Sequence, residues 1–293
     1  MGVIYTPERF RSGQVPFGED LSKAVRELQK LKPVAEDNGV EMVLVHGSVP
    51  EHRHTRRSDV DALIVYDDTA ESRVLDKIRQ GIAQISLETH AQVEATVIPG
   101  SWTQAMVDTY FADPLFVIYL QNVLSSVGPK VLKGRPDPRI MNIPNPGEQV
   151  CKQSLVSYFL EKFSKFDAAL SARYTQGQLN YKVLQRAFEL PRSTKRKLQQ
   201  AFPNLANISE FDAFIEACLE AGYFEVNDGA ALNLLRQRDS EYTDIVESAP
   251  LRGFPDWRLA TKHEEFIAKN FDNALRLAFQ TVGSIAVKLA RKG

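Results

Sequence analysis

The sequence predicts an α+β protein, in which a domain of strands and helices is followed by an all-α domain. The chain has 293 residues, which is long enough for two ordinary domains. Prolines and glycines crowd residues 134–146, as is typical of a domain boundary. Beyond this segment nearly all apolar residues recur with a helical period. We therefore place the first domain at residues 1–143 and the helical domain at residues 144–293.

The first domain alternates helical and extended segments after an irregular lead-in at residues 1–18. A helix is predicted from Asp20, which can cap it, and another between about residues 70 and 88, where isoleucine, leucine and valine follow a helical spacing. Asp113 and Pro114 are typical of the start of a third helix. Strands are predicted at residues 41–45, 59–66 and 92–98, with a short extended piece at Val131 and Leu132.

The second domain shows three apolar stripes with helical spacing. Each stripe predicts one buried helix face. The stripes consist of Leu155, Phe159, Phe163 and Phe166; of Phe214, Ala217, Cys218 and Ala221; and of Phe271, Ala274, Leu275, Ala278, Val282, Ile285 and Leu289.

The composition is that of a globular protein without a strong overall charge. Hydrophobic residues make up 43% and charged residues 25% of the chain, and 36 basic residues balance 37 acidic ones. No global field therefore draws the chain to nucleic acid or to a membrane. Cys151 and Cys218 stand alone in apolar surroundings, and neither a membrane span nor a secretory segment is apparent. We expect a cytoplasmic protein with buried, reduced cysteines.

The most informative segment is VLVHGSVPEHRHTRRSDVDALIVY, from Val43 to Tyr66. Asp59 and Asp61 stand two residues apart at the start of a strand, so their carboxylates lie on the same face. Two adjacent carboxylates repel each other, and a divalent cation commonly relieves that repulsion. The Gly47–Ser48 turn can offer backbone N–H groups to a phosphate chain. The segment predicts a site for phosphate and magnesium.

Glu94 is the candidate third acid of this site. It lies in a predicted half-buried strand, where a glutamate costs stability unless it is solvated, paired or bound to metal. Three clustered carboxylates can hold two Mg²⁺ ions about 3.5–4 Å apart, which is the standard arrangement for in-line attack on a phosphate. Strand glutamates also occur at sheet edges. If the strand register differs, Glu88 is the alternative acid.

These residues together resemble the signature of the polymerase-β-like nucleotidyltransferase superfamily: a Gly-Ser turn, an acid-hydrophobe-acid strand ten residues later, and a third acid in a neighbouring strand. The resemblance implies a small mixed sheet with helices, commonly followed by a helical domain. It implies that Asp59, Asp61 and Glu94 are the catalytic and metal-binding acids. The cofactor is then Mg²⁺, two ions, with Mn²⁺ as a substitute.

The same resemblance implies which residues bind the nucleotide. Gly47 and Ser48 would contact its phosphates, and Arg57 belongs to the basic loop that such enzymes carry before the acids. Lys152 lies where related enzymes often place a lysine that binds the triphosphate. An NTP is the implied co-substrate, with ATP the expected one. A basic loop that is merely solvated is an equal reading of residues 51–58.

The sequence therefore predicts an enzyme that moves a nucleoside monophosphate from an NTP to an acceptor hydroxyl and releases pyrophosphate. The acceptor stays open. An aminoglycoside or similar small molecule would need an acidic wall in the helical domain, and RNA or protein would need a basic one. Basic residues occur in the run from Arg192 to Lys197. The acids available for an acidic wall are Glu161, Glu216, Glu220, Glu264 and Glu265. The rival hypothesis is a non-catalytic module that keeps the fold to bind a nucleotide or a protein.

Overall fold

A computed structural model describes most of the chain. The chain divides into two compact units. The described residues are 21–28, 40–50, 59–66, 72–89, 93–101, 103–110, 114–125, 130–133, 143–177, 180–247 and 257–292. One unit contains the described residues of 16–111 and 116–145, and the other those of 146–293 together with the short segment 112–115. The fold is α+β, as predicted: a small mixed sheet with helices, followed by a helical unit.

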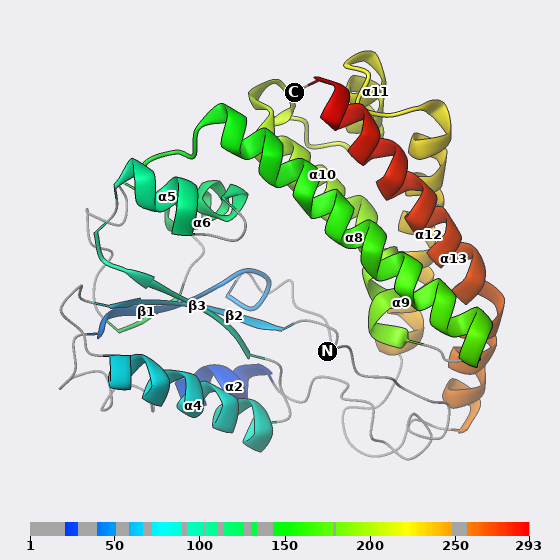
Figure 1. Cartoon of the computed structure of the whole chain (residues 1–293). Helices are drawn as coiled ribbons and strands as arrows, with labels where there is room; N and C mark the ends of the chain where they lie inside the picture. Colours follow the sequence, from blue (N-terminus) through cyan, green and yellow to red (C-terminus); the bar gives the residue numbers. More distant parts are fainter. Residues whose placement is uncertain are drawn as a thin grey trace. The chain divides into compact units, whose positions relative to one another are not determined.

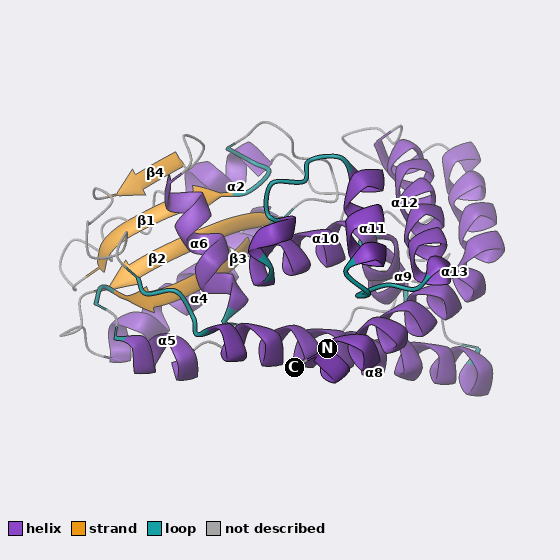
Figure 2. Cartoon of the chain, turned by 90° about the horizontal axis from the view of Figure 1, so that it is seen from above, coloured by secondary structure: helices purple, strands orange, loops and turns teal. Residues whose placement is uncertain are grey.

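The sheet of the first unit has four strands in the order β3-β2-β1-β4 (Figure 2). Its strands are β1 (Val40–His46), β2 (Val60–Tyr66), β3 (Val93–Pro99) and β4 (Lys130–Lys133). β1 runs antiparallel to both β2 and β4, whereas β2 and β3 are parallel. The sheet is therefore mixed, and β3 is its edge strand next to β2. All four predicted extended segments are confirmed as strands.

Two helical layers cover the two faces of this sheet (Figure 1). Alternate residues of β1 and β2, such as Val43, Val45, Ala62 and Ile64, pack with buried residues of α2 (Leu21–Leu28) and α4 (Ser72–Thr89). The remaining set points to the other face and packs with α5 (Gln104–Tyr110), α6 (Leu115–Ser125) and Ile143; it consists of Met42, Leu44, Leu63, Val65 and Ile98. Strands β1, β2 and β3 thus contribute to both cores, as the alternation of their side chains requires.

Most predicted elements of this unit correspond to observed ones. Helices α2 and α4 lie where the apolar spacing places them, and α6 begins directly after Pro114. Helix α5 was not predicted. The lead-in at residues 1–18 and the caps at Asp20 and Asp113 lie outside the described residues.

The second unit is helical throughout its described residues. Its elements are α8 (Glu148–Gln176), α9 (Tyr181–Phe188), α10 (Leu190–Ala201), a 3₁₀ turn η2 (Pro203–Leu205), α11 (Phe211–Glu220), α12 (Val226–Glu247) and α13 (Trp257–Lys292). The long helices α8 and α13 lie side by side (Figure 1).

The contact between α8 and α13 forms from two of the predicted stripes. Every member of the stripe from Phe271 to Leu289 is buried. Phe163 of α8 stacks on Phe279 of α13 with ring centroids 4.3 Å apart. A Cβ on Gly283 would lie 3.0 Å from the Phe163 ring, so a side chain there would crowd the contact between the two helices.

Two further features concern membrane spans and cysteines. Among the described helices, none combines the length and apolar character that a membrane span requires. Cys151 and Cys218 are both free thiols and both buried. Burial raises the pKa of the Cys218 thiol to about 12, so this cysteine is an inert core residue and not a nucleophile.

Candidate active site

The three acids singled out in the sequence gather at one end of the sheet. One carboxylate oxygen from each of Asp59, Asp61 and Glu94 can be chosen so that all three lie within 4.8 Å of one another. Strand pairing explains the cluster, because Asp61 lies directly opposite Glu94 in the parallel β2–β3 ladder. Side chains opposite one another in a ladder share a face, and Asp59 joins them because it precedes Asp61 by two residues.

The third acid of the cluster is Glu94 and not Glu88. Glu88 lies near the end of α4, where its carboxylate accepts a hydrogen bond of 2.7 Å from Gln84. Glu94 is exposed, whereas Asp59 and Asp61 are half-buried. The edge position of β3 leaves Glu94 in contact with solvent, which lowers the cost of placing a glutamate in a strand.

A tight turn adjoins the acids. β1 ends at His46, and residues 47–50 form the turn that follows. Gly47 has a φ of 77°, a left-handed conformation that side chains disfavour. A Cβ on Gly47 would lie only 2.5 Å from Oδ2 of Asp61, so glycine is also required for space. The turn backbone therefore passes directly beside the acid cluster, and Ser48, the next residue, is half-buried in the same turn.

The donor set of this cluster fits a hard divalent cation. Mg²⁺ and Mn²⁺ prefer carboxylate oxygens, and Mg²⁺ sites in proteins usually contain one or two carboxylates together with water and substrate phosphates. Asp59, Asp61 and Glu94 supply only oxygen, and no histidine or cysteine takes part in the described cluster. The backbone at Gly47 lies directly beside this set of oxygens.

His46 is a residue of this site that the sequence reasoning did not single out. It lies opposite Asp61 in the antiparallel β1–β2 ladder, and only 3% of its surface is exposed. Its Nδ1 atom lies 3.1 Å from the hydroxyl of Tyr119 in α6, and the two rings meet edge to face at 5.6 Å. Its Nε2 atom is buried and has no hydrogen-bond partner.

Burial determines the charge of His46. Desolvation lowers the pKa of its imidazole from 6.5 to about 4, so the ring is neutral at physiological pH. A neutral ring adds no positive charge beside Asp61. Its contact with Tyr119 instead links the end of β1, immediately before the Gly47 turn, to α6. The available sequence signal was its place in the alternation Met42, Leu44, His46, which assigns it to the same sheet face as Asp61.

The remaining predicted site residues are not part of this cluster. Arg57, with the rest of residues 51–58, lies outside the described residues. Lys152 belongs to the helical unit, where its ammonium group pairs with Glu148 four residues earlier in α8 at 3.1 Å. Its role in binding a triphosphate stays a prediction, as do the phosphate contacts of Gly47 and Ser48.

The basic run of α10 makes contacts within the helical unit. Arg192 pairs with Asp239 at 2.8 Å, and Lys195 donates to the carbonyl of Ser209. Lys197 is 6% exposed, and its ammonium group lies 5.5 Å from the centroid of the Tyr158 ring. Three of the four cations thus help to hold helices together, which weakens the interpretation of this run as a surface for RNA.

Comparison with known proteins gives matches to solved structures alone. No protein-family model and no curated protein matches the chain. Eleven solved chains match, among them the spectinomycin adenyltransferase AAD(9) from Enterococcus faecialis, solved with ATP and spectinomycin. That match has 12% sequence identity and a TM-score of 0.47, and it covers 89% of this chain and 99% of the other.

Proposed function

We propose that this chain is a metal-dependent nucleotidyltransferase that moves a nucleoside monophosphate from an NTP to an acceptor hydroxyl. The observation that carries the proposal is the convergence of Asp59, Asp61 and Glu94 within 4.8 Å beside the Gly47 turn. Strand register alone brings these acids together, and the motif that contains them resembles that of the polymerase-β-like superfamily. In the reaction the acceptor oxygen bonds to the α-phosphorus, the bond to pyrophosphate breaks, and pyrophosphate leaves.

Each residue of the cluster has a role in this proposal. Asp59, Asp61 and Glu94 hold Mg²⁺, which supplies charge neutralisation on the phosphates and lowers the pKa of the attacking hydroxyl. The turn at Gly47 and Ser48 binds the phosphate chain through backbone N–H groups and the serine hydroxyl. The proposal is supported by the closeness of this turn to Asp61, whose Oδ2 would lie 2.5 Å from a Cβ on Gly47. ATP is the proposed donor, and Arg57 is a further proposed phosphate contact.

The acceptor class stays open between a small molecule, such as an aminoglycoside, and an RNA or protein hydroxyl. The helical unit is the proposed acceptor-selecting part, with its boundary near residue 144. The basic run that favoured RNA is engaged in intramolecular contacts at Arg192, Lys195 and Lys197. Mixtures of small molecules are therefore the first acceptors to offer, before RNA and protein.

The test is pyrophosphate release from each of the four NTPs with Mg²⁺ or Mn²⁺, in the presence of a small-molecule extract, RNA or protein. We expect release with at least one combination, and its loss in the Asp59→Ala, Asp61→Ala double variant. Release that persists in the double variant would show that these acids do not form the site.

The rival function, a non-catalytic nucleotide-binding or protein-binding module, predicts a different result in the same experiment. A nucleotide-binding module binds an NTP, and a protein-binding module need not, but neither releases pyrophosphate with any acceptor mixture. Calorimetric titration with a non-hydrolysable ATP analogue and Mg²⁺ separates the two cases, because it measures binding without turnover. Failure to bind any NTP would exclude the enzyme and the nucleotide-binding module and would leave the protein-binding module.

A further inference from the structure

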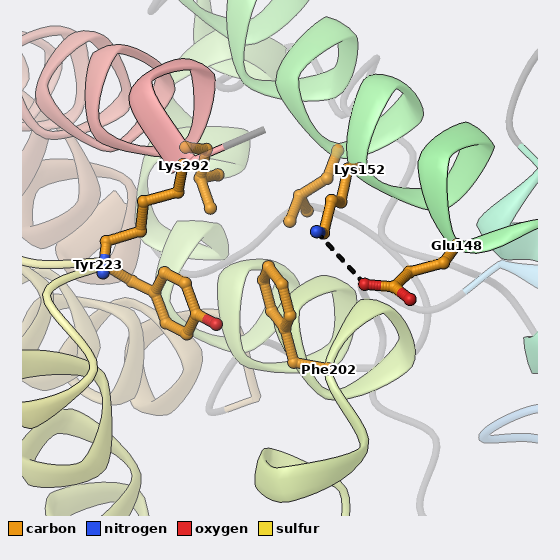
Figure 3. Close-up of a pocket in the computed structure, with 7 residues that line it drawn as sticks. Glu148, Lys152, Phe202, Tyr223 and Lys292 are labelled. Carbon is orange, nitrogen blue, oxygen red and sulfur yellow. Dashed lines mark ion pairs between the residues drawn. The ribbon is translucent and has the colours of Figure 1, made fainter.

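The helical unit contains a cavity of about 360 Å³. Helices α8 and α13 and the segments after α10 and α11 provide its lining: Glu148, Lys152, Leu155, Phe202, Tyr223, Leu289 and Lys292. Figure 3 shows Lys292 on one side and Lys152 with Glu148 on the other, with the rings of Tyr223 and Phe202 between them. The volume is within the range, about 300–1,000 Å³, of sites for small molecules.

Two stacked aromatic rings form one wall of this cavity. Phe202 and Tyr223 lie nearly parallel, 18° apart in plane, with centroids separated by 4.4 Å. The ammonium group of Lys292 lies 5.2 Å from the Tyr223 centroid. Phe202 lies against one face of the Tyr223 ring, and Lys292 lies on the opposite side of that ring (Figure 3). The second face of Phe202 is turned to the side of Lys152 and Glu148 in Figure 3, where a flat ring could continue the stack.

Two lysines give the cavity a positive character. Lys152 pairs with Glu148, whose side chain is 81% exposed, and an exposed pair of this kind contributes little to stability. Glu148 is therefore easily displaced from Lys152 by a competing anion. Lys292 donates to the carbonyl of Ala221. An ammonium group has three donors, so each lysine retains donors beyond these contacts. Two positive charges against one negative charge favour an anion.

The position of Lys292 is built into the fold. Gly222 has a φ of 67°, and a Cβ there would lie 3.1 Å from the ammonium nitrogen of Lys292. Glycine therefore lets the lysine approach the end of α11, whose final carbonyls attract a cation. Tyr223 follows directly, and burial raises the pKa of its hydroxyl, so that it stays protonated as a hydrogen-bond donor. Leu155 and Leu289 are buried and form an apolar floor.

We propose that this cavity is a binding site for a flat aromatic small molecule that carries one anionic group. The ring stacks on Phe202 above the leucine floor, and the anion is held by Lys152 and Lys292. The inference does not rest on Asp59, Asp61 or Glu94, since all seven lining residues belong to the helical unit. One of the seven, Lys152, is also the lysine predicted from the sequence to bind a triphosphate.

The experiment is a calorimetric titration of the full chain with 1-naphthyl phosphate in EDTA. EDTA removes divalent cations and so disfavours phosphate binding at the acid cluster. Three companion probes separate the contributions: 1-naphthol has the ring without the charge, inorganic phosphate has the charge without the ring, and 1-naphthylmethylamine has the opposite charge. We expect saturable binding of 1-naphthyl phosphate, with each companion about tenfold weaker or more, the effect of losing one charge-assisted contact.

Variants locate the binding. Lys152→Gln is expected to weaken it about tenfold, whereas Lys165→Gln is expected to leave it unchanged. Lys165 is the matched control because it also lies on α8 and also pairs with a glutamate four residues earlier, Glu161, but does not line the cavity. Glu148→Gln is expected to tighten binding, because it removes the competing carboxylate from Lys152. Phe202→Leu is expected to weaken binding of 1-naphthyl phosphate and to leave that of phosphate unchanged.

The proposal would be overturned by a lack of saturable binding of 1-naphthyl phosphate, by equal effects of Lys152→Gln and Lys165→Gln, or by weaker binding in Glu148→Gln. Circular dichroism of each variant verifies that it is folded. The Asp59→Asn, Asp61→Asn variant is expected to bind 1-naphthyl phosphate as the unaltered chain does. Loss of binding there would place the probe at the acid cluster, which contradicts the cavity site without affecting the proposed function.

Discussion

Gly47 and Asp61 approach so closely that a Cβ on the glycine would lie 2.5 Å from Oδ2 of the aspartate. The φ of 77° at Gly47 adds a conformational requirement to this steric one. Gly47 directly follows β1, and Asp61 lies fourteen positions later in β2. Their contact makes the turn and the acid cluster one structural unit, so that a change in the turn displaces the Asp61 carboxylate.

Gly47→Ala is expected to reduce pyrophosphate release about 100-fold, because small displacements of reacting groups have effects of this size. It should also cost about 1–2 kcal/mol of unfolding free energy, since alanine disfavours a left-handed conformation. Gly177→Ala is the matched control: Gly177 has a φ of 65°, but its Cβ would meet nothing within 4 Å. The control should lose similar stability and keep its activity. Equal activities of the two variants, measured alongside urea unfolding, would contradict the steric argument.

Glu94→Gln is expected to reduce pyrophosphate release about 100-fold or more, because removal of a direct ligand should exceed the 10–100-fold effect of outer ligands. Glu88→Gln is the control. Both glutamates are exposed and close in sequence, but Glu88 lies on α4 and interacts with Gln84. Activity as a function of Mg²⁺ concentration is the measurement. If both variants retain full activity, the third acid of the cluster has no role in the reaction.

The sequence predicted the acid cluster because its geometry depends on local rules. Side-chain alternation places Asp59 and Asp61 on one face, and a single strand pairing then brings in Glu94. The apolar spacing likewise predicted α8 and α13, whose buried faces follow a helical period over many residues. These features need little or no information about distant parts of the chain.

Other features depend on pairings that no local pattern contains. The order β3-β2-β1-β4 follows from strand partners, one of which, β4, has only four residues. Helix α5 has seven residues, too short for a clear period. The place of His46 in the site requires both its pairing with Asp61 and the approach of Tyr119 from α6. The cavity at Phe202 and Tyr223 forms from segments that are distant in sequence.

His46 is expected to make the stability of the chain sensitive to mild acid. Its pKa is lowered to about 4, whereas the unfolded chain has an ordinary value near 6.5, so the unfolded state binds the proton more readily. The contribution of neutral His46 to the unfolding free energy is therefore fully present above pH 6.5 and is lost as the pH falls toward 4. At pH 5 the loss from this residue is about 2 kcal/mol.

Urea unfolding at pH 7.5 and pH 5.0 measures this effect. The unfolding free energy at pH 7.5 minus that at pH 5.0 should be about 2 kcal/mol smaller in His46→Gln than in the unaltered chain, because glutamine does not titrate. His46→Gln also loses the Tyr119 contact, so its stability at pH 7.5 is lower, and only the pH-dependent difference is diagnostic. An unchanged difference would mean that His46 is protonated without cost in the folded protein.

Lys162 is expected to be a residue whose charge destabilises the helical unit at neutral pH. Burial, followed by repulsion from Arg186, lowers the pKa of its ammonium group to about 8. The unfolded state, with a pKa near 10.5, binds the proton more readily, so stability rises between pH 8 and pH 10.5 and is lowest below this window. Lys162→Met should therefore raise the unfolding free energy at pH 7 by about 1–3 kcal/mol. Loss of the cation–π contact with Tyr158, at 5.4 Å, opposes this gain by about 0.5–1 kcal/mol.

The control for Lys162 is Lys165→Met on the same helix. The Lys165 side chain is 43% exposed and pairs with Glu161, so its replacement should change stability by no more than about 0.5 kcal/mol. Thermal unfolding of both variants at pH 7 and pH 10 distinguishes the loss of a buried charge from a packing effect. The advantage of Lys162→Met should be present at pH 7 and shrink at pH 10, where the lysine of the folded chain is already neutral. A constant advantage at both pH values would indicate a packing effect and not the loss of a buried charge.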